Sequence, residues 1–173
     1  MTKKMWMVRA GRGAFLIDDF KNKNYVSIGW NELGDISEVK RKDKIKKLVK
    51  ESGYYKKQRQ INIATGQVSR FLIDFRKGDY VVSYDPTSRV YLVGEIQSDY
   101  EYNTRLSEYY HLRRVKWLGE VSRDKLSTQT RNTLGAISTI FQIKDRAKKD
   151  ILDVLEGKEH VKDEISNELE EER

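Results

Sequence analysis

Several aromatic side chains of this sequence stand where a strand is expected to give way to a loop. Trp30 ends the run "VSIGW", and Tyr84 ends the run "YVVSY". A flat ring beside a loop can stack on a flat ligand such as an unpaired nucleobase, whereas a ring inside a strand normally packs in the core. Core packing and a pocket wall therefore both stay open for Trp30 and Tyr84. Trp6 and Trp117 fall inside expected strands, and we expect them in the core.

Charged and polar residues are interleaved with these rings. Reading the edge of a base needs hydrogen-bond donors and acceptors, while cations hold phosphates without reading sequence. Our edge-reading candidates are Arg12, Asn31, Ser83 and Asp85, and the interleaved cations include Arg9, Arg70 and Arg131. Asp85 precedes the only proline, so a turn explains it equally well.

The charge of the chain is unevenly distributed. The net charge is +7, but residues 151–173 hold nine acids and three bases, which leaves +13 on residues 1–150. A domain this basic is expected to bind a polyanion, most often nucleic acid, although lysine-rich solubility is the simpler alternative.

Several classes of protein are not expected. With no cysteine the sequence cannot build a disulfide or a thiolate metal site, and its two histidines cannot by themselves assemble a transition-metal centre. We therefore expect no metal and no cofactor. It contains no apolar run of the roughly 18 residues that a membrane span needs, and the N-terminus lacks a secretory signal. We expect a cytoplasmic protein that does not bind membranes.

The pattern of apolar residues predicts an α+β fold, a curved sheet of five or six strands with helices packed around it. The spacing of Asp35 and Glu38 predicts a capped helix that runs to about Glu51, and apolar residues between Ile61 and Phe75 repeat at helical spacing. The expected strands are 4–11, 25–30, 80–84, 89–96 and 109–121, and a charged helix is expected from residue 144 on.

Three long segments together resemble a known family. They are "MWMVRAGRG…FLIDDF…YVSIGWNELGD", "GQVSRFLIDFRKGDYVVSYDPTSRVYLVGEI" and "YEYNTRLSEYYHLRRVKWLGEVSRDKLS". Over about residues 4–142 the chain is similar to the N-terminal domain of Mrr-type restriction endonucleases, which looks like a member of the PUA-like superfamily with the EVE and YTH domains. The resemblance implies a PUA-like curved sheet or partly open barrel over residues 1–142, and a charged helical tail or linker over 143–173.

The resemblance also implies a function. Such a domain would read a modified base, flipped or unpaired, as the non-catalytic specificity part of a restriction or defence system. In YTH domains a tryptophan after the second strand walls an aromatic cage, and its counterpart here is Trp30, with the loop 9–13 beside it. This chain has no second cage tryptophan, so Tyr84, Leu134 or Phe141 would have to close the pocket. The predicted nucleic-acid-binding residues are Arg9, Gly11, Arg12, Trp30, Asn31, Gln67, Arg70, Ser83, Tyr84, Asp85 and Arg131.

Two other functions stay open. Mrr-type proteins carry a PD-(D/E)xK nuclease after the reader, here expected on another segment or a partner chain, and Asp85 with Glu95 imitates such a metal site. Gln97 stands where that motif has its lysine. The charged C-terminal helix could instead dock a partner protein. The partner we expect is modified DNA, with RNA as the alternative.

Overall fold

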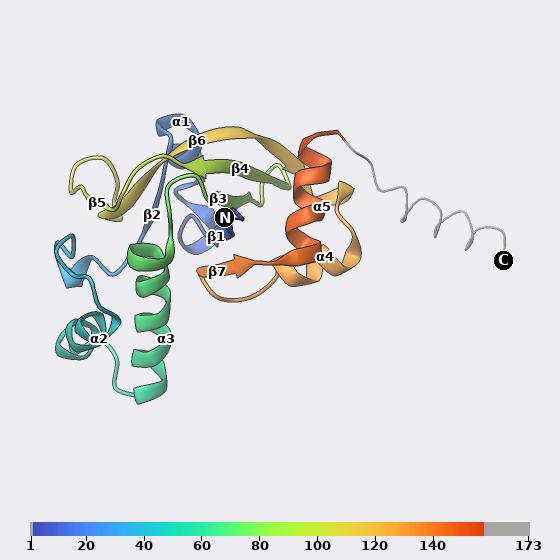
Figure 1. Cartoon of the computed structure of the whole chain (residues 1–173). Helices are drawn as coiled ribbons and strands as arrows, with labels where there is room; N and C mark the ends of the chain where they lie inside the picture. Colours follow the sequence, from blue (N-terminus) through green and yellow to red (C-terminus); the bar gives the residue numbers. More distant parts are fainter. Residues whose placement is uncertain (1, 158–173) are drawn as a thin grey trace, which may run out of the picture.

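A computed structural model describes residues 2–157 of the chain, and its centre is one strongly curved sheet (Figure 1). Six strands follow the order β2-β6-β4-β3-β1-β7, and a short strand, β5, pairs with β6. The pairing is antiparallel except between β1 and β3. The strands are β1 (Met5–Val8), β2 (Tyr25–Ile28), β3 (Tyr80–Asp85), β4 (Val90–Ile96), β5 (Glu101–Tyr102), β6 (His111–Ser122) and β7 (Ile140–Ile143).

The curvature has a local cause in the middle of the sheet. The register between β4 and β6 shifts between Val93 and Gly94, which marks a bulge. A Cβ on Gly94 would stand 2.6 Å from a methyl group of Val115 and 2.7 Å from the indole of Trp117. Only glycine lets the strands approach this closely, and bulges increase the bend and twist of a sheet.

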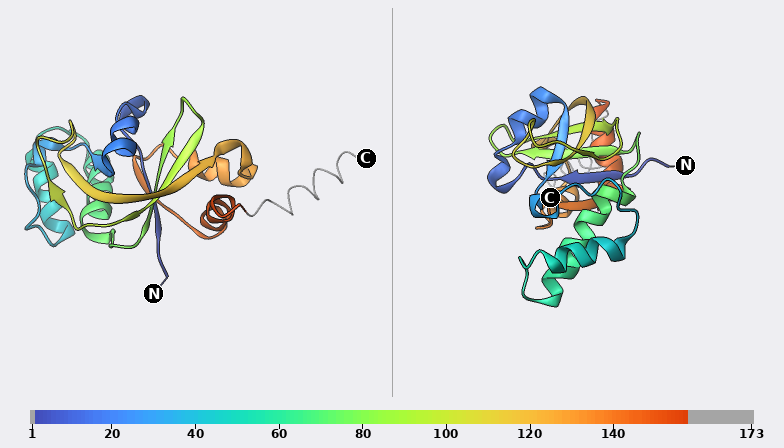
Figure 2. Two further views of the ribbon diagram at one scale, coloured as in Figure 1. Left: turned by 90° about the horizontal axis from the view of Figure 1, so that it is seen from above. Right: turned by 90° about the vertical axis from the view of Figure 1, so that its left-hand side faces the viewer.

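Four of the five α-helices among the described residues form two groups, and α1 lies apart from both (Figures 1 and 2). Figure 1 shows α2 and α3 together on one side of the sheet, and α4 and α5 at the opposite end. The α-helices are α1 (Ile17–Lys23), α2 (Lys42–Glu51), α3 (Gln58–Ser69), α4 (Thr128–Leu134) and α5 (Asp145–Leu155). A π-helical turn, η3 (Arg70–Asp74), continues α3, and η1 (Arg12–Ala14), η2 (Asn31–Leu33) and η4 (Arg123–Lys125) are single 3₁₀ turns.

Three clusters of buried apolar residues hold these layers together. One lies under α1 and η3, a second joins the other face of the sheet to α4 and α5, and a third lies between α2 and α3. Trp6 is buried in the first, where its Nε1 donates to Asp79 at 3.1 Å, so the prediction of a core tryptophan is confirmed. Trp117 is half-buried against the same cluster, and its Nε1 donates to the carbonyl of Phe20.

The predicted architecture, α+β with a curved sheet flanked by helices, is confirmed. One local prediction is wrong, because the helix expected from Asp35 begins only at Lys42. Asp35 instead accepts from the amide and hydroxyl of Ser37 and closes a turn. The strands β5 and β7 were not predicted.

The expected tail from residue 143 on is in part integral to the domain. Helix α5 buries Ala147 and Ile151 in the second core cluster, so this helix packs on the sheet rather than standing free. The remainder of that tail, 158–173, lies outside the described residues. No helix within residues 2–157 is long and apolar enough to cross a membrane.

Candidate functional site

A cavity of about 860 Å³ opens beside Trp30, where loops from distant parts of the chain meet. This size is within the range of pockets that enclose small ligands. The loop after β1, the turn after β2, the connection between α2 and α3, and the segments before β6 and β7 all contribute. It is lined by Arg9, Gly11, Arg12, Gly13, Gly29, Trp30, Asn31, Glu32, Tyr54, Tyr55, Tyr109, Ile137 and Thr139.

Trp30 forms one wall of this cavity, and it is also anchored in the fold. Its ring is half-buried and packs against both the first and the third core clusters. Its indole Nε1 donates to the hydroxyl of Tyr55 at 2.9 Å. The indole therefore serves as core filler on one side and as a cavity wall on the other, which a strand-end position alone left undecided.

The backbone of Trp30 is held in an unusual conformation. Its φ of 64° and ψ of 37° lie in the left-handed region, which costs a non-glycine residue about 1–2 kcal/mol. The carbonyl of Trp30 accepts from Nε2 of the buried His111 at 2.8 Å. Because a carbonyl can only accept, Nε2 carries the proton, and Nδ1 accepts from the hydroxyl of Tyr100 at 2.6 Å. Burial lowers the pKa of His111, which favours this neutral form.

Tyrosines supply the other aromatic surfaces of the cavity. Tyr54 and Tyr55 come from the connection between α2 and α3, and Tyr109 comes from the segment before β6. The ring of Phe15 stands edge-on to Tyr109, with centroids 5.5 Å apart. A Cβ on Gly11 would meet that Phe15 ring at 2.3 Å, and Gly11 has a φ of 80°, so glycine is required at this position.

Arg9 braces one rim of the cavity. Its Nε donates to the carbonyl of Ser138 at 3.2 Å, and its Nη2 donates to the carbonyls of Leu134 and Ala136. Its backbone amide donates to the carbonyl of Thr139 at 3.0 Å. The guanidinium thus ties down the segment before β7, and partial burial lowers its pKa.

The two neighbouring polar candidates differ in how free they are. Asn31 uses both ends of its amide, donating to the carbonyl of Glu108 at 2.8 Å and accepting from the amide of Tyr110 at 3.0 Å. It therefore positions the segment that carries Tyr109. Arg12 is exposed at the rim, and within residues 2–157 its guanidinium makes no ion pair.

The structure brings five of the predicted binding residues to this cavity and leaves six elsewhere. Those at the cavity are Arg9, Gly11, Arg12, Trp30 and Asn31, and those that do not line it are Gln67, Arg70, Ser83, Tyr84, Asp85 and Arg131.

Two of the six are buried and have structural partners. Ser83 is fully buried, and its hydroxyl donates to the carbonyl of Val8 at 2.6 Å. Gln67 is buried and accepts from the amide of Ile140, which fixes strand β7. Both side chains therefore hold the sheet together rather than face a ligand.

The other four lie away from the cavity, on β3 (Tyr84 and Asp85), at the start of η3 (Arg70) and on α4 (Arg131). Tyr84 stacks on Tyr91 with centroids 4.5 Å apart, and Arg131 donates to the hydroxyl of Thr128 on its own helix. Arg70 lies at the junction of α3 and η3. Leu134, one of the residues considered for the second wall, is buried in the core under α4.

Asp85 and Glu95 do not form a shared metal site. Asp85 accepts from the amide of Thr87 and the hydroxyl of Ser88 in the β3–β4 turn, as its turn explanation predicts. It pairs with Val90, and Glu95 lies five residues further along β4, so the two carboxylates are roughly 17 Å apart. Ligands of one Mg²⁺ must each approach to about 2 Å, so these two residues cannot hold it together. Within residues 2–157 no group of three or more acidic, histidine or cysteine side chains could bind a metal ion.

Comparison with protein families places nearly all of this fold in one family. Residues 6–144 match a family described as a domain of unknown function (DUF8426). The chain belongs to this family. A search of curated proteins found no match. All the residues that line the cavity, from Arg9 to Thr139, lie inside the DUF8426 segment, so the cavity is built from the family's own fold.

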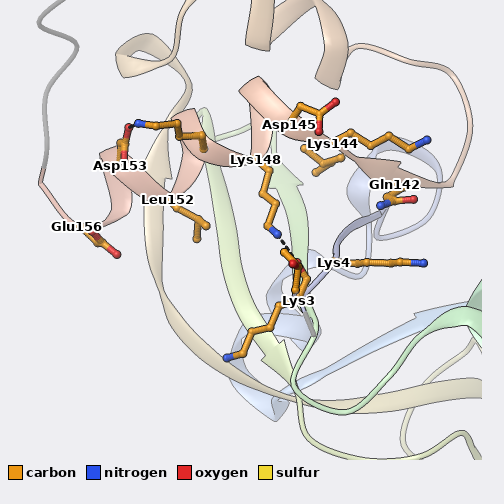
Figure 3. Close-up of a pocket in the computed structure, with 12 residues that line it drawn as sticks. Lys3, Lys4, Gln142, Lys144, Asp145, Lys148, Leu152, Asp153 and Glu156 are labelled. Carbon is orange, nitrogen blue, oxygen red and sulfur yellow. Dashed lines mark hydrogen bonds and ion pairs between the residues drawn. The ribbon is translucent and has the colours of Figure 1, made fainter.

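A second cavity of the DUF8426 chain, of about 640 Å³, lies between the start of β1 and helix α5 (Figure 3). Its lining includes the lysines Lys3, Lys4, Lys144, Lys148 and Lys149. Lys149 pairs with Asp153, Lys3 pairs with Glu95, and Lys148 donates to the carbonyl of Lys3.

Lys4 and Lys144 differ from the other three lysines, and the ammonium of Lys4 stands 5.9 Å from the centroid of the Trp6 ring. In Figure 3, Lys4 and Lys144 extend to the same side, with Gln142 between them. Among the described residues neither ammonium group makes an ion pair. We call the surface formed by Lys4, Gln142 and Lys144 the lysine groove.

Sequence reasoning missed Gly29, Glu32, Tyr54, Tyr55, Tyr109, Ile137 and Thr139 at the first cavity of the DUF8426 domain. Three of them, Tyr54, Tyr55 and Tyr109, belong to the tyrosine pairs of "GYYKK" and "EYYH", which have polar neighbours in the sequence. The first pair was interpreted as a linker and the second as part of a strand. Adjacent tyrosines beside lysines in a loop were the signal that could have found them, because such rings have no apolar partners nearby in the sequence.

Proposed function

We propose that this chain is a non-catalytic reader of a modified nucleobase. The observation that carries the proposal is the half-buried Trp30, whose ring lines a cavity shared with three tyrosines and the loop 9–13. The proposal agrees with the resemblance to the PUA-like domains of Mrr-type restriction endonucleases.

The aromatic lining fits the energetics of holding a base outside its stack. Extruding a base costs a few kcal/mol, and each aromatic surface it then stacks on returns about 1–3 kcal/mol. Trp30 on one wall, with Tyr54, Tyr55 and Tyr109 around the cavity, can offset that cost. The bond from Trp30 to Tyr55 and the left-handed turn held by His111 keep the indole in place before a ligand arrives, which reduces the ordering entropy lost on binding.

Selection of a modified base needs polar contacts in addition to stacking. Burying one methyl group is worth about 0.8 kcal/mol, a factor of about four in affinity. Asn31 is engaged with the segment before β6, so among residues 2–157 the charged rim groups without an ion pair are the guanidinium of Arg12 and the carboxylate of Glu32. The guanidinium can donate to a ring nitrogen or carbonyl, and the carboxylate can accept from an exocyclic amino group.

The lysine groove supplies cations for the phosphates. Arg9 and Thr139 stand at the cavity end of the β1/β7 pair, and Lys4 and Lys144 stand at the other end. Five residues of strand separate the two ends, which is roughly 17 Å. That length corresponds to about five nucleotide steps of a B-form strand. A strand that places one base in the cavity can therefore reach the groove with its backbone.

A binding panel tests the proposal. Methylated, hydroxymethylated and glucosylated oligonucleotides, as single strands, duplexes and RNA, would be titrated against the chain by fluorescence anisotropy, with unmodified oligonucleotides of the same sequence as controls. We expect one modified probe to bind at least about tenfold more tightly than its control, the sum of a buried methyl group and one polar contact. Equal affinity for every modified and unmodified pair would reject the proposal.

The proposed role has a cellular context. A reader of this kind would act in the cytoplasm as the specificity part of a restriction or defence system that cleaves modified DNA. The nuclease would be supplied by another segment or by a partner chain, as in the Mrr-type enzymes that this chain resembles.

A further inference from the structure

The rim of the cavity carries an isoleucine that the fold does not bury. Ile137 lies in the segment between α4 and β7 and lines the cavity, yet its side chain is 98% exposed. It is the most exposed large apolar side chain among residues 2–157; the next, Tyr54, is 72% exposed and lines the same cavity. Exposing a β-branched aliphatic side chain so completely is unfavourable in water and contributes nothing to the core.

The segment that presents Ile137 is held in place. Arg9 donates to the carbonyls on both sides of it, those of Ala136 and Ser138, and also to that of Leu134. Leu134 itself is buried, and the amide of Arg9 bonds to Thr139 on the far side. The backbone is therefore fixed before and after Ile137, so its exposure is a property of the fold rather than of a loose loop.

The surroundings of Ile137 do not resemble an apolar docking patch. Among the described residues that line the cavity Ile137 is the one aliphatic side chain, and it shares the cavity with aromatic rings such as that of Trp30 and with the charged or polar Arg12, Glu32 and Thr139. A protein-binding surface normally has a contiguous apolar centre. A single aliphatic side chain among cations and polar groups is instead typical of wedges that enter a stack of bases, where phosphates meet the cations and the apolar group meets base faces.

We propose that Ile137 enters the base stack of duplex DNA and fills the space left by the base that moves into the cavity. This inference rests on the proposed function and names its substrate class: a double helix from which the modified base is extruded, rather than a strand already single. Ile137 and Trp30 line the same cavity, so a base stacked on the indole leaves its vacancy next to the isoleucine. A single-stranded ligand has no stacked partner strand and needs no such wedge.

The test compares Ile137→Ala with the matched control Ile63→Ala. Ile63 is also exposed, lies on α3 and does not line the cavity. The probes are short DNA duplexes with one methylated adenine or one methylated cytosine, the corresponding single strands, and unmethylated versions of each. A 2-aminopurine next to the methylated base reports unstacking by its fluorescence.

We expect Ile137→Ala to weaken binding of the methylated duplex about tenfold, the loss of one stacking contact, and to leave single-strand binding within about twofold. The 2-aminopurine fluorescence that reports unstacking of the duplex should decrease together with duplex binding. A mismatch opposite the methylated base should reduce the defect, because an unpaired base is cheaper to extrude. Ile63→Ala should behave as the unsubstituted chain, and melting curves should be the same for both variants, since neither side chain is buried.

The outcomes separate the two proposals. If the unsubstituted chain prefers the methylated probes but Ile137→Ala weakens duplex and single strand equally, or weakens neither, the wedge is overturned and the reader function stands. If the unsubstituted chain shows no preference for any modified probe, whether methylated or, in the binding panel, hydroxymethylated or glucosylated, the proposed function and the wedge both fail.

Discussion

Replacing Trp30 by alanine is the sharpest perturbation of the candidate site. It removes the indole wall and the bond from Nε1 to the hydroxyl of Tyr55. Loss of one aromatic stacking surface should cost the bound base about 1–3 kcal/mol, a loss of about 5- to 150-fold in affinity for the modified probe. Binding to unmodified DNA through its phosphates should change little, because Trp30 carries no charge.

The same substitution also affects stability, and the structure sets the size of that effect. A fully buried tryptophan replaced by alanine costs about 3–5 kcal/mol, so the half-buried Trp30 should cost about 2 kcal/mol. For a chain of this length the melting temperature should fall by about 4–8 °C. The variant should therefore be folded at room temperature, where binding is measured by anisotropy.

Trp117→Ala is the matched control. Trp117 is also half-buried against the first core cluster and also donates from Nε1, here to the carbonyl of Phe20 at 2.8 Å, but it does not line the cavity. It should lower the melting temperature by a similar amount and leave the preference for the modified probe intact. If Trp30→Ala retains the preference, or if both variants lose it equally, the indole is a core residue only and the reasoning is refuted.

Three further predictions concern charge, pH and the braced rim. Joint substitution of Lys4 and Lys144 by glutamine should weaken binding of modified and unmodified DNA alike. It should also make the slope of log affinity against log salt shallower by about two, because two phosphate contacts are lost. An unchanged slope would show that the lysine groove does not bind phosphates. Burial lowers the pKa of His111 below 6.5, so the unfolded chain takes up a proton that the folded chain resists. Neutral His111 should therefore contribute fully to the free energy of unfolding above that pH, and the free energy measured by urea titration should decrease as the pH falls from about 7 to about 5. His111→Gln should not show this decrease. An equal decrease in both proteins would contradict the assignment. Arg9→Ala should accelerate amide hydrogen exchange in residues 134–139 and lower the melting temperature, and Arg9→Lys should not restore either, since an ammonium cannot reach the three carbonyls in a fork; full restoration by lysine would show that charge alone suffices.

Those parts of the fold that depend on neighbours in the sequence were predictable. The β3–β4 hairpin follows from two β-rich runs joined by "DPTS", and α3 follows from apolar residues three and four positions apart. The end of β2 could also be placed, which located Trp30 at a loop. The resemblance to PUA-like domains predicted the loop 9–13 beside Trp30, and both line one cavity in the structure.

Other parts could not be read from local patterns. Strand β7 has four residues and exists because its register against β1, over 130 residues away, lets it complete the sheet. Asp35 and Glu38 have the spacing of a helix cap, yet the hydrogen bonds from Ser37 to Asp35 close a turn and the helix begins only at Lys42. A capping pattern in the sequence shows where a helix could begin, but tertiary packing determines where it does begin.

The division has one physical reason. Periodicity, turn residues and composition act over a few positions, so the sequence by itself determined the types of the longer elements, the basic character of the chain and the position of Trp30 at a strand end. Which side chains share a surface depends on contacts between distant segments: the sheet order that brings β1 beside β7, the bond from His111 that holds the turn at Trp30, and the brace from Arg9 that presents Ile137. Only the tertiary structure could turn Ser83 inward to the carbonyl of Val8 and gather three tyrosines from two separate loops around one indole.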